Sequence, residues 1–125
     1  MTLLEKLTLL ENEADAFGFK WENPHQIMSQ IQSECVEINE HLDSTAPENK
    51  IKLQEEIGDL LHAVFSLCVF CKFNPEETLQ NSVDKFERRF NAVKSLAQQK
   101  GLKTMDGLSF DQLMHFWDQA KHSVG

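Results

Sequence analysis

Four carboxylates stand in two short pairs, Glu34-x-x-Glu37 and Glu56-x-x-Asp59. A spacing of three residues places both members of a pair on one helix face, where like charges repel. The second pair leads into an apolar stretch from Leu60 that must be buried, so these carboxylates need a cation. Oxygen ligands suit Mg²⁺, which keeps several waters and is usually completed by substrate phosphates. The pairs therefore indicate phosphate chemistry, and an ordinary acidic helix face is the alternative.

The elements that carry these pairs should all be helices. Apolar residues recur at helical spacing, and alternating strand-like runs are absent. Asn23-Pro24, Asn74-Pro75 and the box from Ser109 are helix-start signals, and Gly101 is a stop signal. We predict an all-α fold with helices near 2–16, 24–43, 48–72, 75–100 and 109–122.

The turn-forming segment 44–47 separates the two acidic pairs and makes their helices antiparallel neighbours. Glu37 lies about seven residues before this turn and Glu56 about nine after it, roughly 10 and 13 Å at ~1.5 Å per residue. The two pairs are therefore expected to face each other.

Length and charge narrow the function classes. The chain of 125 residues fits a single domain, 1–125, and its net charge of -8 argues against nucleic-acid binding. No stretch is typical of a signal peptide or a membrane span, so we expect a cytoplasmic protein without a membrane partner. The three cysteines, in apolar helical contexts, are expected to be buried thiols.

Three cations follow on the fourth predicted helix, Lys85, Arg88 and Arg89. Their spacing places Lys85 on the same side as one of the arginines, an arrangement that suits a triphosphate. The alternative is a solvated stripe in which they pair with Asp84 and Glu87.

Several runs together resemble the MazG family of nucleoside triphosphate pyrophosphohydrolases, in the family's order, over residues 14–121. These runs are Phe17-Gly-Phe-Lys-Trp21, Glu55-Glu-Ile-Gly-Asp-Leu-Leu61, Asn74-Pro-Glu-Glu77, Lys85-Phe-Glu-Arg-Arg-Phe90, Gly101 and Phe116-Trp-Asp-Gln-Ala-Lys121.

The resemblance implies a helical bundle completed as a dimer or a pair of dimers. It also implies Mg²⁺-dependent (or Mn²⁺-dependent) hydrolysis of a nucleoside triphosphate to the monophosphate and pyrophosphate, for nucleotide-pool housecleaning. The family's metal and catalytic positions carry over onto Glu34, Glu37, Glu56 and Asp59. Ser33 and Val83 depart from the family pattern and put substrate contacts in question more than metal binding.

The implied mechanism is substitution at phosphorus, with Glu37 or Glu34 taking the proton of the attacking water and with Lys85 and Arg89 stabilising phosphate charge. For the base, Trp21 and Trp117 are candidates because an aromatic face stacks on any nucleobase, and plain packing is the alternative for both. Weaker substrate-binding candidates are His25 and Lys121.

Two other function classes stay open. Asp59-x-x-His62 suggests a di-metal carboxylate bundle, but the second acidic-histidine motif is missing, which favours a hydrogen-bonded core or boundary histidine. The other class is a non-catalytic helical interaction module. In every case the helix from Leu60 is apolar around most of its circumference, so a second copy of the chain is expected to cover it.

Overall fold

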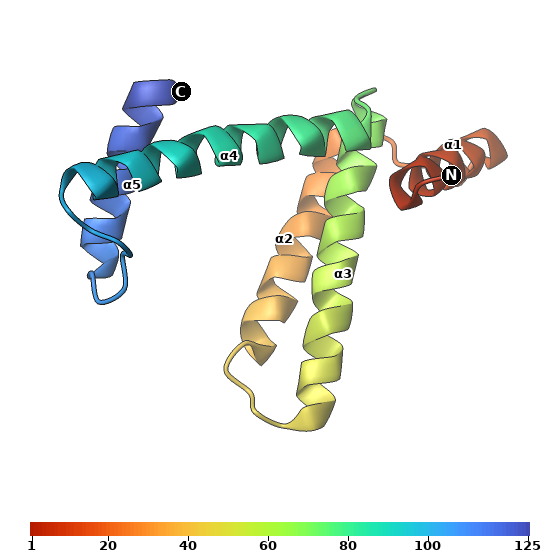
Figure 1. Ribbon diagram of the computed structural model, residues 1–125. Coiled ribbons are helices and arrows are strands. Elements are labelled where there is room, and N and C mark those ends of the chain that lie inside the picture. Colours follow the sequence, from red (N-terminus) through yellow and green to blue (C-terminus); the bar gives the residue numbers. More distant parts are fainter. The chain divides into compact units, whose positions relative to one another are not determined.

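The computed structural model describes residues 1–125 as five helices without a strand (Figure 1). The helices are α1 Leu3–Phe17, α2 Pro24–His41, α3 Pro47–Phe70, α4 Pro75–Gln99 and α5 Phe110–Val124. The prediction of an all-α chain with five helices is confirmed, and each predicted end lies within two residues of the observed one.

Side-chain caps begin three of the helices where the sequence predicts them. The Asn23 side chain accepts a hydrogen bond from the backbone N–H of Gln26 at 3.1 Å, and Asn74 caps α4 in the same way. Ser109 and Gln112 form a reciprocal capping box at the start of α5. Each cap satisfies donors that a helix N-terminus otherwise leaves unpaired.

The chain forms two compact units, Met1–Thr78 and Leu79–Gly125, and each is described by itself. In the first unit, α2 and α3 run antiparallel and side by side, joined by residues 42–46 (Figure 1). Helix α1 packs against α3. The predicted antiparallel arrangement is therefore confirmed, whereas the single domain over residues 1–125 stays a prediction.

The second unit has a small core of its own. Val93 on α4 and Phe116 and Ala120 on α5 are buried together, and Trp117 packs partly buried against them. Gly101 ends α4 with a φ of 75°, a left-handed conformation that glycine adopts without steric cost.

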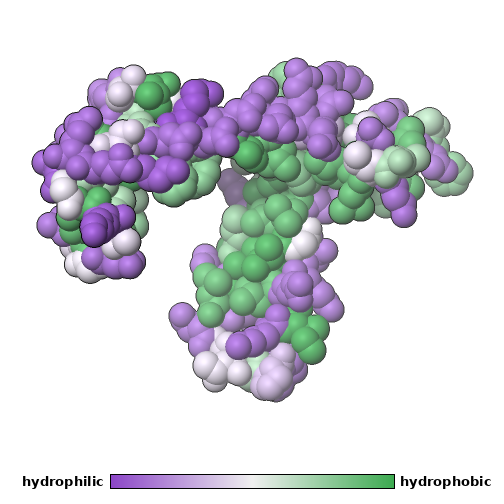
Figure 2. Space-filling view, viewed as in Figure 1, coloured by the Kyte–Doolittle hydropathy of each residue, from purple (hydrophilic) through white to green (hydrophobic).

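Much apolar surface stays exposed in the first unit. Ile57, Leu61 and Val64 lie on one stripe of α3 and are each more than two-fifths exposed. Val36 on α2 is exposed as well, and Figure 2 shows apolar side chains gathered over the α2–α3 pair. A two-helix pair covers only one side of each helix, which leaves the other sides of an all-round apolar helix open.

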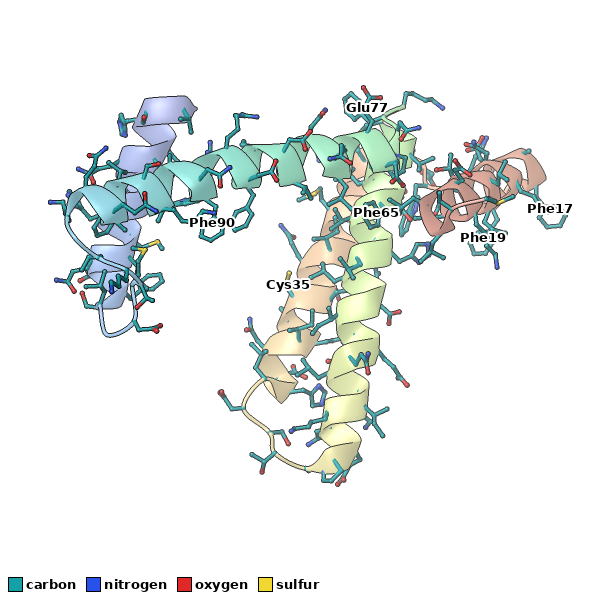
Figure 3. The ribbon with its side chains drawn as sticks, in the orientation of Figure 1. Phe17, Phe19, Cys35, Phe65, Glu77 and Phe90 are labelled. Atoms are coloured by element: carbon teal, nitrogen blue, oxygen red, sulfur yellow. The ribbon has the colours of Figure 1, made fainter.

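The same geometry overturns the expectation of buried thiols. Cys35 and Cys71 are exposed and only Cys68 is half-buried. Figure 3 shows Cys35 on the side of α2 that points away from α3. None of the five helices has the length and apolar character needed to span a bilayer.

Candidate functional site

The four predicted carboxylates lie on the two helices of the antiparallel pair. Glu34 and Glu37 belong to α2, and Glu56 and Asp59 belong to α3. Glu34 is only 6% exposed, whereas Glu37 and Asp59 are exposed and Glu56 is half-buried. Of the four carboxylates, Glu34 is thus the one that is buried.

Glu34 carries the electrostatic signature of this contact. Burial raises the pKa of Glu34 above its ordinary value, and the charges of Glu37 and Asp59 raise the pKa further. Gln30 acts in the opposite direction, because its Nε2 donates a hydrogen bond to Glu34 Oε1 at 2.8 Å. Glu34 on α2 and Asp59 on α3 are therefore near enough for their charges to interact, as the expected facing of the two pairs requires.

The second oxygen of Glu34 has no partner. Glu34 Oε2 is buried and accepts no hydrogen bond. A buried polar atom of this kind is rare in folded proteins and indicates a missing ligand, a water or stored strain. Here the atom belongs to a carboxylate on which the charges of Glu37 and Asp59 act, and carboxylate oxygens are the ligands of hard cations.

Glu56 has a partner that sequence reasoning missed. His41 Nδ1 donates to Glu56 Oε2 at 3.0 Å, across the pair from the last residue of α2 to α3. The signal was available, because His41 follows Glu37 by four residues and so shares its helix face. The contact fixes one oxygen of Glu56 and leaves the other without a protein donor.

The donor set fits a hard divalent cation by its chemistry, since it is all oxygen and includes the unpartnered Glu34 Oε2. As placed, however, no three His, Cys, Asp or Glu side chains lie close enough together to hold a metal ion. The side chains would therefore have to rotate to coordinate a cation, and Glu37 and Asp59 are both exposed to solvent.

Trp21 stands where the sequence places it, between α1 and α2. It is half-exposed and lines a cavity of about 510 Å³ formed by α1, the segment after α1 and α3. His25 is exposed in the first turn of α2 and does not line this cavity. Ser33 is also exposed on α2.

The predicted phosphate-binding cations belong to the second unit. Lys85 and Arg88 are exposed on α4 and form no ion pair. Arg89 is engaged, because its Nε donates to the backbone carbonyl of Gly125 at 3.0 Å and its guanidinium lies 5.6 Å from the ring centroid of Trp117. The alternative of pairing with neighbouring acids is thus not what the structure shows.

The two remaining candidates are engaged within the same unit. Trp117 packs on the core and lies 6.0 Å from Phe86 between ring centroids, which agrees with the packing alternative. Lys121 Nζ lies 3.7 Å from Asp118 Oδ1 on an exposed face of α5.

Comparison with known proteins adds a family match and named relatives. The sequence profile of the MazG nucleotide pyrophosphohydrolase domain matches residues 22–94, more than half of the chain. Over 112 residues the chain is 30% identical to the nucleoside triphosphate pyrophosphohydrolase/pyrophosphatase MazG of Thermotoga maritima, covering 90% of the chain and 41% of that protein. It is 32% identical over 104 residues to the nucleoside triphosphate pyrophosphohydrolase of Escherichia coli K12, covering 83% and 39%. The chain thus spans about two-fifths of the length of these relatives.

Proposed function

This chain belongs to the MazG nucleotide pyrophosphohydrolase domain family, and from this premise we propose that it hydrolyses nucleoside triphosphates to the monophosphate and pyrophosphate with Mg²⁺ or Mn²⁺. The names of the two relatives, which describe nucleoside triphosphate pyrophosphohydrolases, support the reaction class. The observation that carries the proposal is the buried Glu34 Oε2, which has no hydrogen-bond partner in a setting of further carboxylates.

We assign Glu34, Glu37, Glu56 and Asp59 to hold the divalent ion. When bound, the ion would supply charge neutralisation for the triphosphate oxygens and acidify an attacking water molecule. Glu34 would contribute its free oxygen, since Oε1 is already engaged by Gln30. His41 would keep Glu56 oriented through the bond to its Oε2.

We assign proton acceptance to Glu37, because its carboxylate is exposed to solvent whereas Glu34 is buried and bonded. In the proposed step, the water oxygen bonds to the α-phosphorus. The bond between the α-phosphorus and the α–β bridging oxygen breaks, and pyrophosphate leaves with the bond electrons. The water proton passes to the Glu37 carboxylate.

Phosphate binding is proposed for the cations of α4 and α5. Lys85 and Arg88 are exposed and unpaired, so they are free to bind phosphate oxygens. Arg89 and Lys121 would assist once they exchange their present partners, Gly125 and Asp118, for phosphate. Trp21 would stack on the base. Trp117 is packed against the core of the second unit, and His25 is a weaker candidate for a substrate contact.

We also propose that two or four copies of the chain associate through the exposed α3 stripe of Ile57, Leu61 and Val64. Sedimentation should give a dimeric or tetrameric mass that falls to the monomer in Leu61→Lys. A monomeric mass for the unsubstituted protein would contradict this part of the proposal.

The reaction is tested by measuring pyrophosphate and monophosphate from each common ribo- and deoxyribonucleoside triphosphate. Activity should require Mg²⁺ or Mn²⁺, disappear with a chelator, and fall about a hundredfold or more in Glu34→Gln and in Glu56→Gln. Glu40→Gln is the matched control, because Glu40 is an exposed acid of the same helix with no hydrogen bond. Absence of pyrophosphate release with any triphosphate and either metal would refute the proposal and favour a non-catalytic module.

A housecleaning role is the physiological form of this proposal. It expects faster hydrolysis of nonstandard or surplus triphosphates than of the common ones in the same assay. Equal hydrolysis rates for the two groups of triphosphates would contradict the housecleaning role but not the proposed reaction.

A further inference from the structure

The cavity beside α3 contains a polar group that the proposed reaction does not use. The walls include Leu10 on α1 and Phe70 on α3, and Phe19 and Trp21 come from the segment after α1. Figure 3 shows Phe19 next to α1. The lining also holds polar and charged side chains, among them two carboxylates, Glu11 and Asp15. Of these two, Glu11 is the one that is hydrogen-bonded to α3. A pocket with apolar walls and a few convergent polar groups is the usual form of a small-molecule site.

Two side chains of α3 hold Glu11 in place. Ser66 Oγ donates to Glu11 Oε1 at 2.6 Å, and His62 Nε2 donates to the same oxygen at 2.9 Å. Ser66 is only 5% exposed and the Glu11 side chain is 20% exposed. Both bonds end on Oε1, so Glu11 Oε2 is a fixed acceptor without a donor from the protein.

The cavity and the proposed reaction site lie along the same face of α3. Asp59, His62 and Ser66 are spaced by three and four residues, so they follow one another on one face of the helix. Asp59 belongs to the acidic cluster, and His62 and Ser66 line the cavity. Ser66 lies roughly 10 Å along the helix axis from Asp59 at ~1.5 Å per residue. A ligand that is bound at the acidic cluster by its phosphates can therefore extend into the cavity.

We propose that this cavity takes the base of the substrate nucleotide and that Glu11 selects bases with an exocyclic amino group. The inference rests on the proposed function. Stacking on Trp21 accepts any base, so selection must come from a polar group with a defined position. A carboxylate accepts a hydrogen bond from the amino group of cytosine, adenine or guanine, and it repels the carbonyl oxygen that uracil and thymine present there.

The cytosine and uracil nucleotides give the sharpest test, because they differ at this group. We expect the protein to have a higher kcat/KM for dCTP than for dUTP. Glu11→Gln keeps an oxygen for Ser66 and His62 and turns an amide donor toward the base. The ratio of the two kcat/KM values should therefore fall about tenfold or more in Glu11→Gln, and dUTP should gain in absolute terms.

Glu13→Gln is the matched control, since Glu13 is an exposed acid of α1 that does not line the cavity. A purely structural role for Glu11, as a tie between α1 and α3, would lower activity on both nucleotides and leave their ratio unchanged. An unchanged ratio, or equal kcat/KM values in the unsubstituted protein, would overturn the inference while the proposed reaction stands.

Binding separates this inference from the reaction itself. Calorimetry with dCMP and dUMP in chelator-treated buffer needs neither the metal nor turnover. We expect dCMP to bind more tightly than dUMP, with the preference lost in Glu11→Gln, even if no triphosphate is hydrolysed. Equal binding of both monophosphates, or binding of neither, would overturn the inference.

Discussion

Replacement of Glu34 by Gln should stabilise the metal-free protein, although it should abolish the proposed activity. The buried Oε2 has no partner, and a buried unsatisfied polar atom costs about 1–3 kcal/mol. The cover over Glu34 is only the contact between two helices, and Glu37 and Asp59 beside it reach water, so the lower end applies. Gln keeps the acceptor for Gln30 and offers an N–H₂ donor to its acidic neighbours.

We therefore expect about 1 kcal/mol of added stability for the metal-free variant at pH 7, or a Tm higher by about 3–5 °C for a chain of this size. Urea unfolding in chelator measures the difference. Mg²⁺ should stabilise the unsubstituted protein by mass action and the variant much less, which reverses the order of the two proteins at high Mg²⁺.

The pH dependence follows from the direction of the pKa shift. The folded-state pKa of Glu34 lies above its ordinary value of 4.5, so the folded protein binds this proton more tightly than the unfolded chain does. The metal-free protein gains stability from this group as pH falls through the folded pKa, and the gain is complete below 4.5. The advantage of Glu34→Gln should accordingly be present at pH 7 and vanish at pH 4. Equal stability of the two proteins at pH 7, or an advantage of Glu34→Gln that persists at pH 4, would refute the role given to the unpartnered Oε2. As the control, Glu40→Gln should change the free energy of unfolding by less than about 0.5 kcal/mol.

Three further predictions concern neighbouring features. His41→Ala should raise the Mg²⁺ concentration needed for half-maximal pyrophosphate release about tenfold because it frees Glu56, and a lower requirement would show that His41 competes with the metal. Ser109→Ala should lower the free energy of unfolding in urea by about 1 kcal/mol, because the capping box of α5 is lost. Ser109→Asp should keep most of the stability, because aspartate also caps a helix. Gly101→Ala should lower the free energy of unfolding in urea by about 1 kcal/mol, because alanine is strained at a φ of 75°. Gly101→Asn should lower it less, and equal losses for the two variants would contradict this explanation.

Local chemistry made the fold predictable. Asn23 and Ser109 mark helix starts because each cap involves residues three apart, which the sequence shows directly. The count of residues from Glu37 and from Glu56 to one short connection predicted that the two acidic pairs face each other, and the interaction of the Glu34 and Asp59 charges agrees with it.

Long-range partner choice was beyond the sequence. Glu11 and Ser66 are separated by 55 positions, and their contact depends on how α1 packs on α3. Helical periodicity predicts which residues share a helix face. It does not predict which of these faces another helix of the same unit will cover. The exposure of Cys35 has the same origin, because its face of α2 points away from α3 in the first unit.

The acidic cluster of Glu34, Glu37, Glu56 and Asp59 is carried entirely by two consecutive helices, α2 and α3. Both of its sides lie between residues 34 and 59, on helices that a connection of five residues, 42–46, joins. Closing so short a loop costs little entropy, and the contacts that form the cluster are close in sequence. The pairing of α2 with α3 is therefore enough to bring the two sides of the cluster together.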